Sequence, residues 1–173
     1  MSNQTAARET ATHWLWLVPP VVMADQLSKW LIAEYLELFS RIELLSILGI
    51  TRLHNTGAAF SFLANAGGWQ RWFFVLLGAG VVVMILVWLR KLPSQGQGIL
   101  AAGLALVAAG ALGNVIDRVW HGYVLDFISV HYGESYFPAF NIADIAITIG
   151  AGLLILDAAL EYIRSRTGTS EPK

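Results

Sequence analysis

The stretch Gly113–Asp144, GNVIDRVWHGYVLDFISVHYGESYFPAFNIAD, places Asp117, Asp126 and Asp144 beside some of the most apolar sequence in the chain. An ionised carboxylate in or against a lipid bilayer is unfavourable by several kcal/mol unless it is paired or hydrated, so such residues are candidates for function. The sequence on either side must therefore explain what these three aspartates do.

The overall composition is that of a membrane protein. The 173 residues are 56% hydrophobic and 13% charged, whereas an average soluble domain has about 25% charged residues. A net charge of -1 with scattered Lys and Arg residues excludes a nucleic-acid partner. The absence of cysteine excludes thiol catalysis and Cys-ligated metals. The histidines form no HExxH motif, so we expect neither a metal ion nor another cofactor.

Four apolar segments predict an all-α, multi-pass membrane protein with four spanning helices, at residues 13–36, 72–89, 99–112 and 142–163. Only 72–89 is an uninterrupted run of 18 apolar or Gly residues, about the length that spans a bilayer. The first segment should bend at Pro19 and Pro20, and its Asp25 and Lys29 are spaced to pair on one helix face. The last two segments are rich in Gly and Ala, which lets helices pack closely.

The connections between these helices are unequal. Residues 37–68 are too polar and Gly-rich to span, and we expect small strands and turns on the membrane surface. Residues 119–140 are expected to form a loop or short helix. One domain, residues 13–166, then lies between polar tails at 1–12 and 167–173.

Four spans bring the polar residues of all helices to one side of the membrane. The tails and residues 90–98 share one face, and 37–68 and 119–140 share the other. The tail face collects six of the cations on shorter segments: Arg8, Arg90, Lys91, Arg164, Arg166 and Lys173. The other face has Lys29, Arg41, Arg52, Arg71 and Arg118. The positive-inside rule therefore places the termini in the cytoplasm and the polar cluster outside.

The five aspartates differ in their local partners. Asp25 precedes Lys29 by one helical turn and is interpreted as a structural residue paired with it. Asp117 adjoins Arg118 and follows Asn114, so it is interpreted as structural, in an ion pair with Arg118 or in a hydrogen-bonded helix end. Asp157 is interpreted as an interfacial residue. Asp126 and Asp144 have no obvious local cation.

Two carboxylates held together at the edge of a low-dielectric region share a proton, which is the arrangement of aspartic proteases. Spacing alone leaves structural acids or an ion path as alternatives. A serine nucleophile is disfavoured, because Ser28 adjoins Lys29 but neighbouring helix positions point apart.

Five motifs in a fixed order resemble the bacterial lipoprotein signal peptidases, or signal peptidase II. They are Asp25-Gln26-x-x-Lys29; Asn55-Thr56-Gly57-Ala58-Ala59-Phe60; Gly110, Gly113, Asn114, Asp117 and Arg118; Gly122-x-Val124-x-Asp126-Phe127; and Phe140-Asn141-x-Ala143-Asp144. This chain departs from the family pattern at Ala109 and Leu125, where Gly and Val are common. Neither departure changes a carboxylate.

The resemblance implies an inner-membrane aspartic endopeptidase that cleaves diacylglyceryl-modified prolipoproteins before the lipidated cysteine. Asp126 and Asp144 match the catalytic pair. Residues matching the supporting polar set are Asp25, Lys29, Asn55, Gly57, Asn114, Asp117, Arg118 and Asn141. Residues 37–68 match an extracytoplasmic β-cradle, and 119–140 could act as a lid. The expected partners are prolipoproteins and membrane lipid, with the protein acting as a monomer and its active site at the periplasmic face.

Two rival functions remain at this point. A small proton-coupled transporter could use the same acids, although such a protein should show paired broken helices in two related halves. A membrane scaffold would use the polar residues only to hold helices together.

Overall fold

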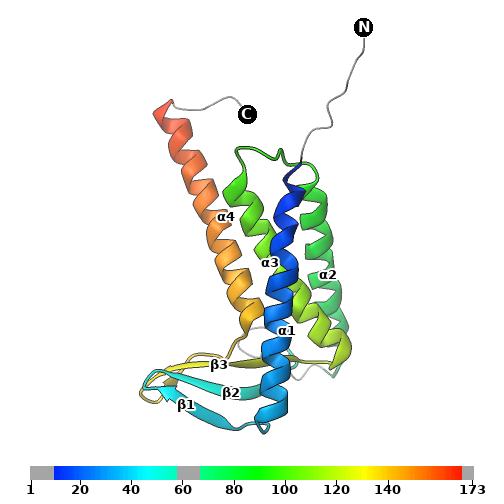
Figure 1. Ribbon diagram of the computed structural model, residues 1–173, viewed down its shortest axis with the longest axis vertical. Helices are drawn as coiled ribbons and strands as arrows, with labels where there is room; N and C mark the ends of the chain where they lie inside the picture. The colour runs from blue at the N-terminus through cyan, green and yellow to red at the C-terminus, as the bar shows by residue number, and fades with distance from the viewer. Residues whose placement is uncertain (1–9, 58–66, 169–173) are drawn as a thin grey trace.

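The computed structural model describes residues 10–57 and 67–168; residues 58–66, within the predicted cradle, lie outside the described part. In chain order the elements are η1 Ala11–Leu17, α1 Val18–Tyr35, β1 Arg41–Leu45, β2 Leu48–Asn55, α2 Trp69–Leu89, α3 Gly98–Trp120, β3 Val124–Tyr132, β4 Ser135–Tyr136 and α4 Ile142–Thr167. The four α-helices run side by side, and the sheet lies across one end of them (Figure 1).

Three helices of the described chain are long and apolar enough to cross a membrane: α2, α3 and α4. The protein is therefore a multi-pass membrane protein. The remaining helix, α1, has 18 residues and buries Asp25 and Lys29 against its neighbours. The helix predicted at 99–112 continues to Trp120, so the polar GNVIDR sequence is helical.

The first helix begins differently from the expected bent span. A 3₁₀ segment, η1, covers Ala11–Leu17, and the α-helix starts at Val18 with the prolines in its first turn. Proline lacks the N–H that an α-helix interior needs, but the first turn does not use it. Ala11, expected in the polar tail, is buried and donates its N–H to the Leu92 carbonyl at 3.0 Å.

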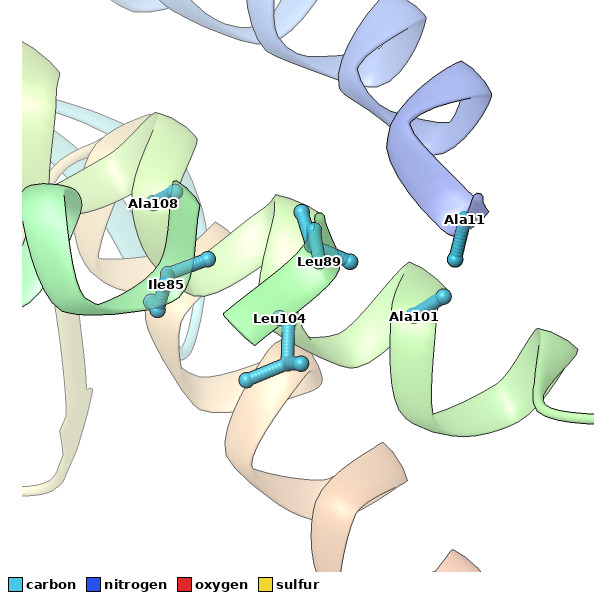
Figure 2. Close-up of a cluster of buried hydrophobic side chains, with 6 residues drawn as sticks. All are labelled: Ala11, Ile85, Leu89, Ala101, Leu104 and Ala108. Atoms are coloured by element: carbon cyan, nitrogen blue, oxygen red, sulfur yellow. The ribbon is translucent and has the colours of Figure 1, made fainter. Parts of the chain in front are cut away.

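The apolar core at the end away from the sheet joins η1, α2 and α3. Its fully buried side chains are Ala11, Ile85, Leu89, Ala101, Leu104 and Ala108, and Figure 2 shows them meeting between these elements. Removing such side chains from water or lipid contact fixes how the helices pack.

Small residues bring α3 and α4 into close contact, as the sequence predicted. A Cβ atom at Gly103 would lie 3.0 Å from the Gly150 carbonyl oxygen, and one at Gly150 would lie 2.7 Å from the Gly103 oxygen. A Cβ at Gly110 would collide with the Ala143 carbonyl. This close approach holds the start of α4 against α3, where the polar residues gather.

The sheet confirms the strands predicted within 37–68 and corrects the interpretation of 119–140. Its four antiparallel strands run in the order β1-β2-β3-β4, so β3 is an interior strand and not part of a loop or short-helix lid. The pairing places Leu53 opposite Asp126 and Asn55 opposite Val124. Gly122, Gly133 and Pro138 interrupt this segment. The β-branched residues between them form a strand because β2, distant in sequence, supplies a partner.

Candidate active site

The first buried carboxylate group surrounds Lys29. The Lys29 Nζ lies 2.8 Å from an Asp25 oxygen and 2.8 Å from an Asp117 oxygen, and all three side chains are at most 5% exposed. Gln26 adds a hydrogen bond of 2.9 Å from its amide to the other Asp117 oxygen. We call Asp25, Gln26, Lys29 and Asp117 the lysine cluster.

These contacts confirm the predicted Asp25–Lys29 pair and show that the predicted Asp117–Arg118 pair is wrong. Consecutive residues of a helix do not face each other, so Asp117 meets Lys29 of α1 instead. Arg118 donates from Nη2 to the Gly57 carbonyl at 2.7 Å and from Nη1 to the Asn114 carbonyl at 3.4 Å. Arg118 therefore ties the end of β2 to α3.

The second group contains Asp126, on β3, in a site lined by amides. Asn55 donates to Asp126 Oδ2 at 3.0 Å, and Asn141 donates to Oδ1 at 2.7 Å. Asp126 is 4% exposed. In the described ranges 10–57 and 67–168, neither Asp126 nor Asp144 forms an ion pair.

Asp144 lies in the first turn of α4, in a capping box with Asn141. The Asn141 side chain accepts from the Asp144 N–H at 3.0 Å, and Asp144 Oδ2 accepts from the Asn141 N–H at 3.2 Å. Asn114 donates to Asp144 Oδ1 at 2.9 Å. The capping box explains locally why Asn and Asp stand at this spacing where a helix begins.

Burial raises the pKa of Asp126 to about 7, and the nearby charge of Asp144 adds to the shift. The amide hydrogen bonds from Asn55 and Asn141 act in the opposite direction but do not cancel it. Asp126 can therefore hold a proton near neutral pH, and it is electrostatically coupled to Asp144.

Both carboxylates line one cavity of about 1080 Å³. Its walls come from the sheet on one side and from α4, including Ile145 and Ile149, on the other. Of the ten sequence-predicted residues, five line this cavity: Asn55, Asn114, Arg118, Asp126 and Asp144. Asn141 is fully buried and bonded to both aspartates. Gly57 donates its N–H to Asn55 Oδ1 at 3.0 Å. The remaining three predicted residues, Asp25, Lys29 and Asp117, belong to the lysine cluster.

The predicted convergence of polar residues on one end of the helices is thus confirmed for the described residues, and two carboxylates with amide partners share a large, partly apolar cavity. The family model described as Signal peptidase (SPase) II matches residues 17–160. The chain belongs to the signal peptidase II family.

Relatives and solved structures agree with this membership. The lipoprotein signal peptidase of Shewanella pealeana is 49% identical over 151 residues, which cover 87% of this chain and 88% of that protein. That of Shewanella oneidensis is 46% identical over 169 residues, covering 96% and 97%. A solved bacterial membrane enzyme has a TM-score of 0.77 at 31% identity, over 93% of this chain and 94% of its own. A second has a TM-score of 0.72 at 29% identity, over 88% and 97%.

A signal peptidase II is an aspartic peptidase, and such chemistry needs two interacting carboxylates that a substrate can reach. Asp25 and Asp117 form ion pairs with Lys29 and do not line the cavity, whereas Asp126 and Asp144 line it, together with Arg118, and form no ion pair with a described residue. The arrangement can share one proton between the cavity carboxylates and offer the other carboxylate to water.

Sequence reasoning missed two contributions to this site. Gln26 bridges Asp25 and Asp117, and its position inside an otherwise apolar helix was the available signal. The Leu125 N–H donates to Asp117 Oδ2 at 3.3 Å, which holds β3 against α3 at the residue before Asp126. A backbone contact between distant segments leaves no mark in the sequence.

Proposed function

We propose that this signal peptidase II cleaves diacylglyceryl-modified prolipoproteins on the N-terminal side of the lipidated cysteine, with Asp126 and Asp144 as its catalytic pair. The observation that carries the proposal is the contrast in partners. Asp126 and Asp144 are hydrogen-bonded by asparagines and line the cavity, while Asp25 and Asp117 share one ion-pair partner, Lys29.

The two carboxylates divide the work by protonation. Protonated Asp126 donates its proton to the scissile carbonyl oxygen, while ionised Asp144 takes a proton from the water whose oxygen attacks the carbonyl carbon. When the tetrahedral intermediate collapses, the C–N bond breaks, Asp144 gives its proton to the leaving cysteine nitrogen, and a hydroxyl of the intermediate returns a proton to Asp126 as the product carboxyl group forms. The pKa of Asp126, raised to about 7 by burial and by the charge of Asp144, supports giving the starting proton to Asp126.

The supporting residues hold these carboxylates in place. Asn141 contacts both aspartates, and Asn55 holds the second Asp126 oxygen. Asn114 orients Asp144, and Arg118 fixes Gly57 and thereby the end of β2. Asp25, Lys29 and Asp117 fasten α1 to α3, so their role is to support the site and not to react.

The membrane arrangement follows from the same architecture. We infer four spans, with η1 and α1 together forming the first, cytoplasmic termini and a single domain over residues 13–166. The sheet and cavity then lie at the periplasmic face of the inner membrane. Ile145 and Ile149 on the cavity wall suit the signal peptide and diacylglyceryl chains, and the protein would act as a monomer without a cofactor.

Replacing either aspartate with asparagine tests the pair, because the shape is kept and the ionisable group is lost. We expect Asp126→Asn and Asp144→Asn each to lower cleavage of a diacylglyceryl prolipoprotein in membranes by about 10³–10⁴-fold, as expected when a group that acts in the transition state is removed. Cleavage is followed by the size shift of the substrate.

The matched control is Asp157→Asn, which alters a carboxylate on α4 remote from the cavity lining and should leave the rate unchanged. Full cleavage by a well-expressed Asp126 or Asp144 variant would show that the pair is not catalytic.

A further inference from the structure

A second polar feature of the cavity lies on the sheet, at Arg41 of β1. The Arg41 side chain lines the cavity together with Phe39, Thr51, Ser129 and Tyr136. Its side chain is 24% exposed, so most of the guanidinium is enclosed. None of the steps assigned to Asp126 and Asp144 uses this residue.

Three neighbours hold the guanidinium against the sheet. Arg41 Nε lies 2.9 Å from a Glu43 carboxylate oxygen, and its Cζ lies 4.4 Å from the centre of the Tyr136 ring. Gly49 leaves the space beneath it, because a Cβ there would lie 3.2 Å from Arg41 Nε and 3.1 Å from the Ile42 carbonyl oxygen. The side chain is thus positioned before any ligand arrives, which lowers the entropy lost on binding.

The Nη groups of Arg41 lack the carbonyl partners that the Nη groups of Arg52 and Arg118 have. Across residues 10–57 and 67–168, the Arg41 Nη2 is buried without an acceptor, and the Nε has only the Glu43 carboxylate beside it. Arg52 donates from Nη1 to the Ala33 and Leu36 carbonyls at 2.9 Å, and Arg118 donates to Gly57. A guanidinium has five N–H donors, and leaving buried ones unfilled is unfavourable, so this end of the cavity favours an acceptor.

The strand register places Arg41 at a defined remove from the catalytic pair. Arg41 is opposite Thr51, and Leu53 is opposite Asp126. Two strand spacings and two residues along β2 separate the Cα atoms of Arg41 and Asp126 by about 12 Å. An extended peptide advances about 3.3 Å per residue, so three or four residues would cover that distance.

The direction in which the substrate chain lies in the cavity decides which part of it reaches Arg41. On α4 the cavity lining includes Ile145, Ile147 and Ile149, and on the sheet it includes Arg41, Thr51 and Ser129. The sheet lies across the end of the helices at which α4 begins (Figure 1). If the signal peptide and the diacylglyceryl chains follow α4, the mature segment extends over the sheet.

We propose that Arg41 binds an acidic side chain of the mature segment, three or four residues after the cleaved bond. The inference rests on the proposed function, because it assumes that Asp126 and Asp144 mark the position of that bond. Carboxylate is the acceptor that matches a guanidinium fork best, through two parallel charge-assisted hydrogen bonds. Arg41 is therefore a residue for substrate selection, separate from catalysis.

The test compares diacylglyceryl prolipoproteins that differ only at the third and fourth mature residues, which are Asp, Asn or Lys. We expect wild type to cleave the Asp substrate with kcat/KM about fivefold to tenfold above the Asn substrate, a ratio typical of one charge-assisted contact, and to cleave the Lys substrate least. Arg41→Gln should bring the Asp-to-Asn ratio close to one. Arg41→Lys, which keeps the charge but not the fork, should give an intermediate ratio.

A control and two further arms make the result decisive. Arg90→Gln changes an exposed arginine following α2 and should keep the wild-type ratio. An Arg41→Gln variant that slows both substrates equally would show a structural role and overturn the proposal. If the effect of Arg41→Gln depended on anionic lipid in the vesicle and not on the peptide residue, the ligand would be a lipid phosphate, which would also overturn it.

Failure of this inference is distinguishable from failure of the proposed function. Equal cleavage of all three substrates by wild type would contradict the role of Arg41 while leaving the peptidase intact. Absence of cleavage of every substrate by wild type would contradict the proposed function itself. If Arg41→Gln does not accumulate, the wild-type and Arg41→Lys ratios decide the question, and equal values for these two would refute the need for the fork.

Discussion

The lysine cluster and the Asp126–Asp144 pair are two sets of carboxylates at the same end of one helix bundle, and they differ in the side chains that bind them. Asp25 is 1% exposed, Asp117 3% and Asp126 4%, whereas Asp144 is partly exposed, so burial does not distinguish Asp126 from the lysine cluster. Their partners do. Lys29 forms ion pairs with Asp25 and Asp117. Asn55, Asn114 and Asn141 donate hydrogen bonds to Asp126 and Asp144.

This difference distinguishes an ion pair that holds helices together from carboxylates that can gain and lose a proton. A buried ion pair fixes both partners as ions and holds the helices that carry them, because removing either charge strands the other. Amide donors stabilise a carboxylate without supplying a charge, so burial and the neighbouring acid can still raise the pKa of Asp126 to about 7. A carboxylate with such a pKa can exchange a proton near neutral pH.

Asn114 links the two groups. Its side-chain oxygen accepts from Lys29 Nζ at 3.3 Å, and its amide nitrogen donates to Asp144 at 2.9 Å. The lysine cluster thereby sets the orientation of the asparagine that holds Asp144. Under the proposed function, the lysine cluster supports the Asp126–Asp144 pair without contacting a substrate.

Removing the shared cation should have the largest effect on stability. Lys29→Met leaves Asp25 and Asp117 buried near each other without a counter-charge, and we expect a loss of about 3–5 kcal/mol in the free energy of unfolding. The measurement is denaturant unfolding in detergent, together with the yield of folded protein.

The triple variant Asp25→Asn, Lys29→Met and Asp117→Asn is the matched control, because it removes the charges together. It should recover at least half of that loss, since no charge is left unpaired. A triple variant as unstable as Lys29→Met alone would show that shape, and not charge, makes the lysine cluster important.

Neutralising Asp117 should have a smaller effect that falls on folding. Asp117→Asn keeps an acceptor for Lys29 and Gln26 but loses the charge, which we expect to lower stability by about 1–3 kcal/mol. Turnover per folded molecule should stay near that of wild type, measured as cleavage normalised to monodisperse protein. Loss of turnover in well-folded Asp117→Asn protein would place Asp117 in the reaction and erase the contrast between the two groups.

The smallest effect is expected from crowding the lysine cluster through a neighbouring glycine. A Cβ at Gly113 would lie 2.7 Å from Asp25 Oδ2, so Gly113→Ala must shift that carboxylate. We expect a destabilisation of about 1 kcal/mol, at the lower end for overpacking, because a side-chain end can move. Gly152→Ala, where no atom lies within 4 Å of the added Cβ, should not destabilise. Equal effects of the two substitutions would mean that helix propensity, and not the carboxylate, is responsible.

The sequence predicted the helices better than the connection between α3 and α4. Apolar length identified α2, and small residues identified the packing of α3 on α4, because both are local properties. The capping relation of Asn141 and Asp144 was visible as a three-residue spacing. The i, i+4 spacing likewise predicted the pair of Asp25 and Lys29.

What the sequence did not predict depends on segments that are distant along the chain. The strand β3 needs β2 as its partner, and the ion pair of Asp117 needs Lys29, 88 positions earlier. Adjacency suggested Arg118 for Asp117, although consecutive helical residues point apart. Spacing within one element can be read from sequence, but partner choice between elements requires the fold.

Direct observation of the Asp126 proton tests the central claim. The folded-state pKa of about 7 exceeds the ordinary value of 3.8, so the folded protein binds this proton more tightly than the unfolded chain. Its contribution to stability is therefore complete below about pH 4 and is lost as pH rises towards 7. Cleavage should also fall above about pH 7, as the shared proton leaves.

The measurement is infrared difference spectroscopy of wild type against Asp126→Asn across this pH range, following the carbonyl stretch of a protonated carboxylic acid. We expect a band in wild type at pH 6 that disappears with a midpoint near pH 7 and is missing from the variant at every pH. No such band at pH 6, or an identical band in Asp126→Asn, would contradict the claim that Asp126 holds a proton for catalysis.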